Sequence, residues 1–368
     1  MSARSSLEAL YTSTNGATRW RVRKHWLDNG NICRWYGIDC VRGDVTSIDL
    51  GGNRLLGTLP SEVAALTSLR VLNIDESSLS GTLPYSVKHL RSLDTLLLAS
   101  NPLLSGSLPS HIDFQPSVFD VSSSRLSGTI AASLMRQLAP RTHRLQLDHM
   151  RVSGSVPSEV GDLHRARYIF VHASPMLSGT LPTQLGNLGT TLLGTSFAGT
   201  RLSGTIPTQL GRLSQLRSLW LVNTSLSGTL PSQIGQLGRV KELELHKNRL
   251  SGSLPYSLGA TGAPLKASLR RCVLTASQGP YQPLHSMRPA EKFGESESNR
   301  FSCPLPNLPA PCVAHLSCKH VADSQRRNIS APGDISVASN QLPESIPMRR
   351  GKPGRGGRGR GRRGRGIS

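Results

Sequence analysis

Cysteine and histidine residues gather between positions 303 and 320, and their side chains are of the types that bind metal ions. Thiol and imidazole groups that could bind zinc are carried by Cys312, His315, Cys318 and His320. Their spacing matches none of the usual paired zinc motifs. We therefore expect no metal site. We expect instead a disulfide bond between two of Cys303, Cys312 and Cys318, with the histidines as bystanders.

Short motifs that mark common catalytic sites are absent from the chain. It contains no Walker loop, no HExxH zinc motif and no GxSxG nucleophile turn. The glycines after Gly351 follow no predicted strand and precede no predicted helix, so they do not form a dinucleotide-binding fingerprint. The sequence therefore predicts a non-catalytic protein with no cofactor.

A second group of polar and aromatic residues is suited to recognition rather than catalysis. Carboxylates attract basic partners, and aromatic side chains in polar surroundings are the usual anchors of a binding surface. The candidates for ligand binding are Asp75, Glu76, Asp120, Asp148, His149, Tyr168, Phe170, His172, Trp220, Glu244 and His246. Whether these residues share a surface depends on the elements that carry them.

Those elements are predicted by a short sequence motif that is repeated along the chain. Its best copies are NRLLGTLP at 53–60, TRLSGTIP at 200–207, TSLSGTLP at 224–231 and NRLSGSLP at 248–255. The closing prolines, with Ala131 at one such place, follow one another at steps of 22 to 26 residues. A period in the twenties with leucines at fixed offsets predicts a leucine-rich-repeat solenoid.

Each repeat is expected to form one turn of a coil with its leucines inside. Leu72 and Ile74 are two residues apart, so both point to the same face of a strand. One turn cannot bury its apolar side alone, and stability therefore comes from stacking on its neighbours. The glycine of each Leu-Ser-Gly permits a tight backbone passage, and the proline fixes φ on the convex side.

Residues between and just after the two inward positions of each strand point away from the core. The recognition candidates occupy these positions, where basic residues are few, chiefly Arg144 and Lys247. We expect an acidic inner surface, with Phe170 and Trp220 exposed in the middle of the sheet as apolar anchors. The alternative is that these two are ordinary single exposed aromatics. The partner should present basic or neutral polar groups.

The repeat consensus LxxLxxLxLxxNxLSGxLP resembles the plant-specific class of leucine-rich repeat, and the resemblance covers roughly residues 1–320. That class occurs in receptor-like kinase ectodomains, receptor-like proteins and polygalacturonase-inhibiting proteins. The resemblance implies an α/β solenoid, a right-handed superhelix with a concave parallel β-sheet. It also implies a secreted or surface-exposed sensor or inhibitor that binds a protein, peptide or glycan.

In this class an asparagine just past the strand usually satisfies backbone groups inside the turn. The chain keeps Asn53, Asn101 and Asn248 at this place. Elsewhere the place is held by Ser77, Ser124, Ser174, Thr200, Thr224 and Met150. Hydroxyl groups do part of the same work. We therefore expect the repeats in the middle of the solenoid to be less tightly held together than those at its ends.

Four regions follow from the resemblance and the repeat register. Residues 1–44 resemble the N-terminal cap of the class, with its helix, its tryptophans and a pairing of Cys33 with Cys40. Residues 45–281 hold nine clear repeats and one degenerate repeat, in which Cys272 should be a buried free thiol. Residues 282–320 resemble a cysteine-bearing C-terminal cap, and residues 321–368 form a disordered basic tail.

The compartment is read from the cysteines and the N-terminus. Paired cap cysteines favour an oxidising, extracellular or cell-surface setting. The first residues contain no apolar core of a signal peptide, and no stretch approaches the ~18 apolar residues of a membrane span. We favour a gene model that lacks its true start over a cytoplasmic or nuclear protein. If the chain is secreted, Asn223 and Asn328 lie in glycosylation motifs.

The charge is unevenly placed. The net charge is +21, and the segment from Arg349 to Arg365 carries nine basic residues and no acid. Such Arg-Gly tracts bind RNA through charge and guanidinium stacking. The contacts would come from Arg355, Arg358, Arg360, Arg362, Arg363 and Arg365. The alternative function is therefore an intracellular scaffold with an RNA-binding tail.

Overall fold

The computed structural model describes residues 1–253, 255–258, 271–275, 300–302 and 312–315. The chain divides into two units, Met1–His320 and Val321–Ser368, and the second lies outside the described residues. The same holds for Cys303, Cys318, Asn328 and the tail arginines. Predictions about these residues therefore remain predictions.

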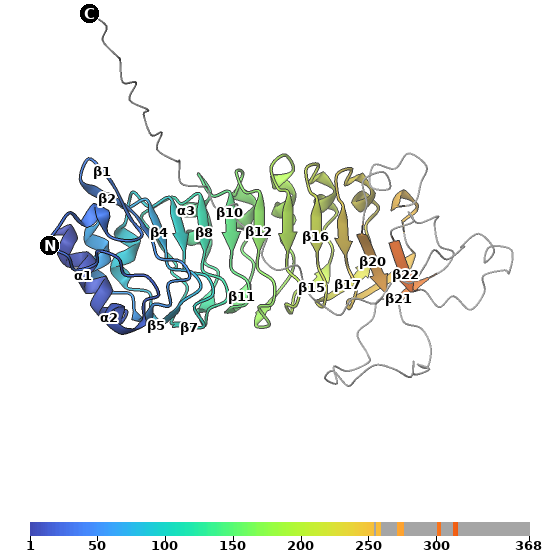
Figure 1. Cartoon of the computed structure of the whole chain (residues 1–368). Coiled ribbons are helices and arrows are strands. Elements are labelled where there is room, and N and C mark those ends of the chain that lie inside the picture. The colour runs from blue at the N-terminus through green and yellow to red at the C-terminus, as the bar shows by residue number, and fades with distance from the viewer. Residues whose placement is uncertain (254, 259–270, 276–299, 303–311, 316–368) are drawn as a thin grey trace, which may run out of the picture. The chain divides into compact units, whose positions relative to one another are not determined.

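Parallel strands stacked one per repeat form the main sheet (Figure 1). In sheet order its strands are β1 (Ile38–Val41), β2 (Asp44–Asp49), β4 (Val71–Asn73), β6 (Thr95–Leu97), β8 (Val118–Asp120), β10 (Arg144–Gln146), β12 (Tyr168–Phe170), β14 (Gly194–Ser196), β16 (Ser218–Trp220), β18 (Glu242–Glu244), β20 (Arg271–Thr275) and β22 (Cys312–His315). Within this sheet β1 pairs antiparallel with β2, and every later pairing is parallel. This confirms the predicted solenoid with a parallel sheet.

The Leu-Ser-Gly segments form short secondary ladders at the end of each turn. These strands are β3 (Leu56–Thr58), β5 (Ser78–Thr82), β7 (Leu103–Ser105), β9 (Ser127–Thr129), β11 (Arg151–Ser155), β13 (Leu177–Ser178), β15 (Ser203–Thr205), β17 (Ser225–Thr229), β19 (Arg249–Ser253) and β21 (Arg300–Ser302). Gly106 has φ +92°, and a Cβ there would lie 2.7 Å from the Thr82 methyl group of the preceding repeat. Both the backbone angle and the close approach therefore require glycine.

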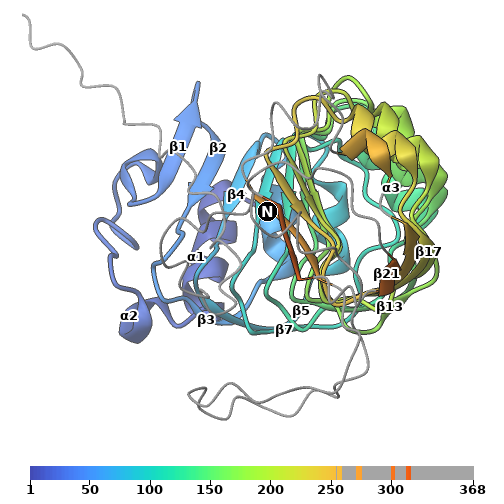
Figure 2. The same cartoon turned by 90° about the vertical axis from the view of Figure 1, so that its right-hand side faces the viewer.

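Short helices line up on the side opposite the sheet when the molecule is viewed along the stack (Figure 2). They are η2 (Ser61–Ala65), η3 (Tyr85–His89), α3 (Ala132–Leu138), η4 (Ser158–Asp162), η5 (Thr183–Leu188), η6 (Thr208–Arg212), η7 (Ser232–Gln236) and η8 (Tyr256–Leu258). Proline precedes each 3-10 helix of this row, η2 to η8. Ala131 precedes α3 with φ −72° and ψ 139°, close to the −69° and 149° of Pro157. Alanine therefore replaces proline without a change of path.

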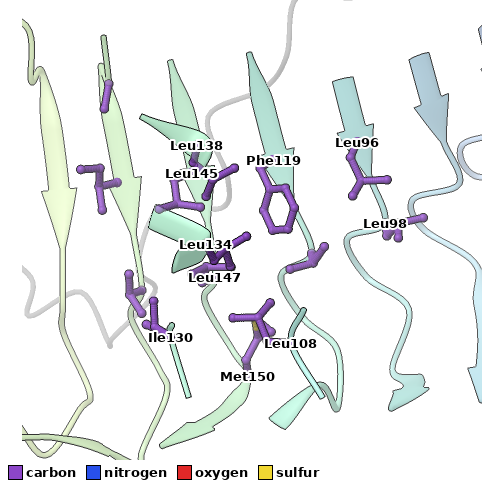
Figure 3. Close-up of a cluster of buried hydrophobic side chains, with 14 of the residues drawn as sticks. Leu96, Leu98, Leu108, Phe119, Ile130, Leu134, Leu138, Leu145, Leu147 and Met150 are labelled. Atoms are coloured by element: carbon purple, nitrogen blue, oxygen red, sulfur yellow. The ribbon is translucent and has the colours of Figure 1, made fainter. Parts of the chain in front are cut away.

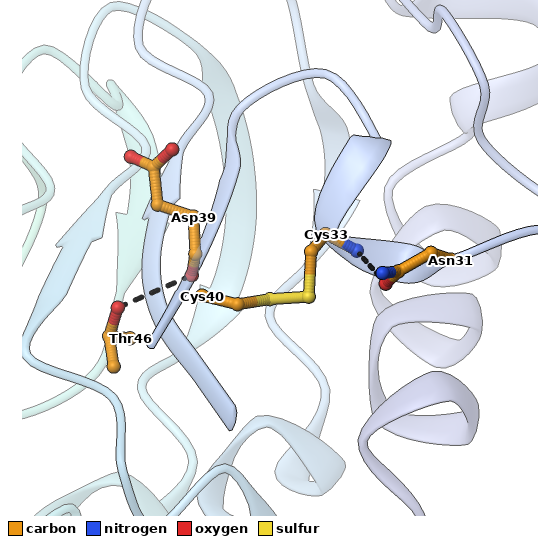
Figure 4. The surroundings of a disulfide bond; sticks show 5 residues. All are labelled: Asn31, Cys33, Asp39, Cys40 and Thr46. Atoms are coloured by element: carbon orange, nitrogen blue, oxygen red, sulfur yellow. Dashed lines mark hydrogen bonds between the residues drawn. A yellow bond between two sulfur atoms is a disulfide. The ribbon is translucent and has the colours of Figure 1, made fainter. Parts of the chain in front are cut away.

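The N-terminal segment covers the open end of the first repeat. It contains α1 (Ala3–Ser13), α2 (Gly16–Arg19) and η1 (Ile32–Arg34), and α1 packs against η2. Leu7 and Leu10 of α1 are fully buried. Cys33 and Cys40 form a disulfide bond with their Cα atoms 5.6 Å apart (Figure 4). In the same N-terminal segment, four buried aromatic rings form a chain of contacts: Tyr11, Trp20, Trp26 and Trp35.

The apolar core runs through the interior of the coil, where each repeat adds its inward residues (Figure 3). Leu96, Phe119 and Leu145 stand at the same register on neighbouring strands. All three are buried. A continuous row of this kind buries apolar surface that no single repeat could bury alone.

Asparagine and hydroxyl side chains satisfy the turns to different extents. The Asn101 amide donates to the carbonyls of Ile74 at 2.8 Å and Leu98 at 3.0 Å, and it accepts from the Leu79 amide at 2.9 Å. The Ser174 hydroxyl makes contacts at 3.4 Å only. Hydrogen bonds of that length are weak. The Ser124 and Thr200 hydroxyls, by contrast, donate to the carbonyls of Val121 at 2.9 Å and Phe197 at 2.7 Å. The greater looseness predicted for the middle of the solenoid therefore remains a prediction.

Candidate functional site

Two aromatic rings meet on the concave face of the sheet, across an intervening strand. Phe170 on β12 and Trp220 on β16 stack with their ring centroids 6.0 Å apart and their planes 9° from parallel. They stand in register with Ser196 of β14, which lies between them. Gly194 and Ser196 carry too little side chain to separate the rings. The small residues of β14 therefore let the aromatics of two non-adjacent strands pack together.

This contact overturns the expectation that the two aromatics are exposed. Phe170 is 7% exposed and Trp220 8% exposed. With Ala198, and with Tyr168 and Val222 at its edge, they form a small apolar cluster separate from the main core. We call these five residues the aromatic cluster. The indole Nε1 of Trp220 is buried within it and has no hydrogen-bond partner.

Three polar residues converge beside the aromatic cluster. Asp148 follows β10, and its Oδ2 lies 3.2 Å from Nδ1 of His149 and 3.8 Å from Nε2 of His172. His172 follows β12, the neighbouring strand, and the His149 amide donates to the His172 carbonyl at 2.9 Å. The two imidazole rings meet edge to face, and the ring of His172 also contacts Phe170. We call Asp148, His149 and His172 the Asp–His cluster.

The electrostatics of the Asp–His cluster differ between its two histidines. The hydrogen bond to Asp148 raises the pKa of His149. Burial lowers the pKa of His172 below its ordinary value, and the charge of Asp148 only partly offsets this. The exposed ring therefore holds a proton more readily than the buried one. Chemically, the cluster offers one carboxylate and two imidazoles to a cation or a polar ligand.

The predicted acidic surface is not uniform. Asp120, Asp148 and Glu244 are buried, so the expectation that these carboxylates face open solvent is wrong. Asp120 accepts hydrogen bonds from the Ser122 amide at 3.1 Å and hydroxyl at 2.6 Å. Its burial nevertheless raises its pKa. Neighbouring strands lie close enough for one side chain to cover the next, and this removes water from the acids.

The remaining candidates lie further from the two clusters or at their rim. Half-buried Asp75 and exposed Glu76 follow β4, which is separated from β10 by β6 and β8. Buried Glu244 lies on β18, next to β16, and half-buried His246 follows that strand. Asn223 is exposed in the turn after β16, three residues beyond Trp220.

Sequence reasoning named all three members of the Asp–His cluster, but only as separate contacts for a ligand. The signal that joins them is the repeat register. Asp148 follows the inward Leu147, and His172 follows the inward Val171, one repeat of 24 residues later. Equivalent positions in consecutive repeats are neighbours in the sheet.

Within the described residues, no helix is both long and apolar enough to cross a bilayer.

Known proteins resemble the chain in both sequence and structure. The Leucine rich repeat family matches residues 44–103 and again residues 215–237. Phytosulfokine receptor 1 of Arabidopsis thaliana is 34% identical over 94 residues, which are 24% of this chain and 9% of the receptor. Receptor-like protein 5 of the same plant is 35% identical over 66 residues, covering 18% of this chain and 24% of that protein. The chain thus spans a quarter or less of these two relatives.

A solved structure matches most of the chain. It is the ectodomain of the plant membrane receptor kinase GASSHO1/SCHENGEN3 from Arabidopsis thaliana, with a TM-score of 0.66 and 26% identity. The match covers 82% of this chain and 33% of that ectodomain. The repeat phrase, the parallel sheet and these relatives agree. Together they support a leucine-rich-repeat protein of the plant type.

Proposed function

We propose that the chain is a non-catalytic recognition module that binds a protein or peptide ligand on its concave face, outside the cell. The binding surface consists of the aromatic cluster and the Asp–His cluster. The ligand lies across β10 to β16 and contacts both clusters. Asp75, Glu76, Glu244 and His246 flank this surface on the other strands.

The observation that carries the proposal is a set of buried polar atoms with no hydrogen-bond partner on this one face. They are Oδ1 of Asp148, Nδ1 of His172 and Nε1 of Trp220. A buried polar group left without a partner costs about 1–3 kcal/mol. A ligand reaches these atoms once the side chains that cover them turn aside, and its donors and acceptors then recover that cost while the aromatic cluster offers it an apolar contact.

The chemistry of the face favours a peptide over a nucleic acid. A peptide backbone carries both donors and acceptors, and its side chains can add positive charge opposite Asp148. A nucleic acid would bring phosphates towards the carboxylates of Asp120 and Asp148, which repel them. The RNA-binding alternative depends on residues 349–368, outside the described residues, and no structural observation favours it.

Relatives and the disulfide support an extracellular ligand. One relative carries the name of a phytosulfokine receptor, and the GASSHO1/SCHENGEN3 ectodomain was solved in complex with Casparian strip integrity factor 2. The Cys33–Cys40 disulfide is the kind of bond that persists in oxidising compartments. In that setting Asn223 is an exposed acceptor for a glycan at the edge of the proposed surface.

The test is selection of peptides from a displayed random dodecapeptide library against the full oxidised chain. Selected peptides are then measured on Trp220→Ala, with thermal unfolding of each variant as a check on folding. Trp220→Ala should weaken binding ~30-fold, the effect of losing about 2 kcal/mol from a central anchor.

Two controls locate the binding surface. Tyr85→Ala changes a residue that is 79% exposed on η3, away from the sheet, and should leave the affinity unchanged. Deletion of residues 349–368 should also leave it unchanged. Peptides that bind Trp220→Ala as tightly as the original chain, or that lose binding with the tail, would contradict the proposal. The proposal would also be contradicted if selection against the original chain enriched no peptide beyond those enriched by selection against Trp220→Ala.

A further inference from the structure

We propose that Asp148, His149 and His172 bind a divalent transition-metal ion of the zinc type on the concave face. The site goes beyond peptide recognition, because it can be occupied without a peptide. Its ligands are a carboxylate oxygen and two imidazole nitrogens from two consecutive repeats. Among the described residues, this is the one group of three such side chains whose ligand atoms all lie within 4.8 Å of one another.

The geometry is close to that of a metal centre. Zinc binds nitrogen and oxygen at about 2.0–2.2 Å, so neighbouring ligands of a tetrahedral ion stand about 3.3–3.5 Å apart. Oδ2 of Asp148 lies 3.2 Å from Nδ1 of His149 and 3.8 Å from Nε2 of His172. All three ligand atoms lie within 4.8 Å of one another, which is close enough for rotation of the side chains to bring them to one ion.

The three ligands differ in burial: Asp148 and His172 are held in the surface, whereas His149 is exposed. The side chain of Asp148 is 9% exposed, and its Oδ1 has no hydrogen-bond partner. His172 is 14% exposed, and its imidazole packs against the rings of His149 and Phe170. His149 is 52% exposed and can close over the ion from the solvent side.

The donor set selects the class of ion. Two imidazoles and one carboxylate suit transition metals such as zinc, whereas magnesium and calcium prefer oxygen ligands throughout. Three protein ligands also leave a fourth position open, as in zinc sites that exchange ligands. A peptide carboxylate or histidine could fill that position, which would link the metal to recognition if the proposed function holds.

A second cluster of the same composition provides a matched control. Asp113 contacts His89 through Oδ2 at 2.6 Å and His111 through Oδ1 at 2.9 Å. Its two histidines therefore approach opposite oxygens of one carboxylate and do not converge on a common point. If composition alone decided metal binding, both clusters would bind the ion. If geometry decides, only the Asp–His cluster does.

The experiment is titration of the full, oxidised, metal-free chain with Zn²⁺ by calorimetry, and with Co²⁺ by its visible absorption. We expect one strong site, with binding to Mg²⁺ at least 100-fold weaker. Asp148→Asn and His149→Ala should each reduce the Zn²⁺ affinity at least tenfold and weaken the Co²⁺ absorption. His149 is exposed, so its replacement leaves the fold intact, which thermal unfolding checks.

Two further variants assign the site. His89→Ala disrupts the control cluster, and His315→Ala removes a member of the cysteine and histidine group near the end of the repeats; both should keep the affinity. Unchanged Zn²⁺ binding in Asp148→Asn and His149→Ala, loss in either control, or no binding at one ion per chain would overturn the proposal. Since no peptide is present, failure of the peptide selection leaves this result unaffected, and the reverse also holds.

Discussion

The interior and the concave face use neighbouring residues of the same strands, yet they follow different rules. On β16, Leu219 points inward, is 1% exposed and stands in register with Thr195 and Leu243. The next residue, Trp220, lies on the concave face in register with Ser196 and Glu244. The inner row must be filled in every repeat, because each turn depends on its neighbours for burial. The concave row is free of that demand, so its residues differ from strand to strand and can serve recognition.

A cavity among the inward-pointing residues should have the largest effect on the free energy of unfolding. Leu245 is fully buried in the ninth repeat. Replacing it with alanine should lower the unfolding free energy by ~2–5 kcal/mol, because the neighbouring repeats cannot close the gap. Urea denaturation followed by circular dichroism measures the loss. Val222→Ala, at the half-buried edge of the concave face, is the control and should cost less. A near-neutral Leu245→Ala would mean that this repeat is not packed as described.

The asparagine turns should show a smaller effect. Asn101→Ser should destabilise the chain by ~1–3 kcal/mol, because buried carbonyls and an amide lose their partners. Thr200→Val removes one hydrogen bond, from the threonine hydroxyl to the Phe197 carbonyl, and should cost ~1 kcal/mol. Both are measured by urea denaturation. An equal or larger loss for Thr200→Val would refute the view that asparagine and hydroxyl turns differ in strength.

The smallest effect is expected on the concave face. Trp220→Phe keeps an aromatic ring against Phe170 and removes an indole N–H that has no partner. Its unfolding free energy should change by less than ~1 kcal/mol. Calorimetric melting tests this, and the affinity for a selected peptide should fall if the ligand accepts a hydrogen bond from Nε1. A loss of stability as large as that of Leu245→Ala would place Trp220 in the structural core rather than in a binding surface.

Different parts of the molecule were predictable to different degrees. The inward row was predictable because leucines at fixed offsets have one way to be buried. The paths of the Leu-Ser-Gly segments were predictable as well, since glycine permits the φ near +80° seen at Gly179 and Gly204. The state of the concave residues was not. Phe170 and Trp220 looked exposed because a single strand predicts only which way a side chain points, not what covers it.

The sequence by itself determined the period, the inward leucines and the parallel sheet, because each repeat contains the leucines, the glycine and the closing residue that define one turn. The tertiary structure decided what happens between repeats. Gly194 and Ser196 leave the space in which Phe170 meets Trp220, and the register of β10 and β12 brings Asp148 to His172. These contacts join residues that are 24 to 50 positions apart in the chain. Their burial depends on the volume of side chains in other repeats, which no local pattern encodes.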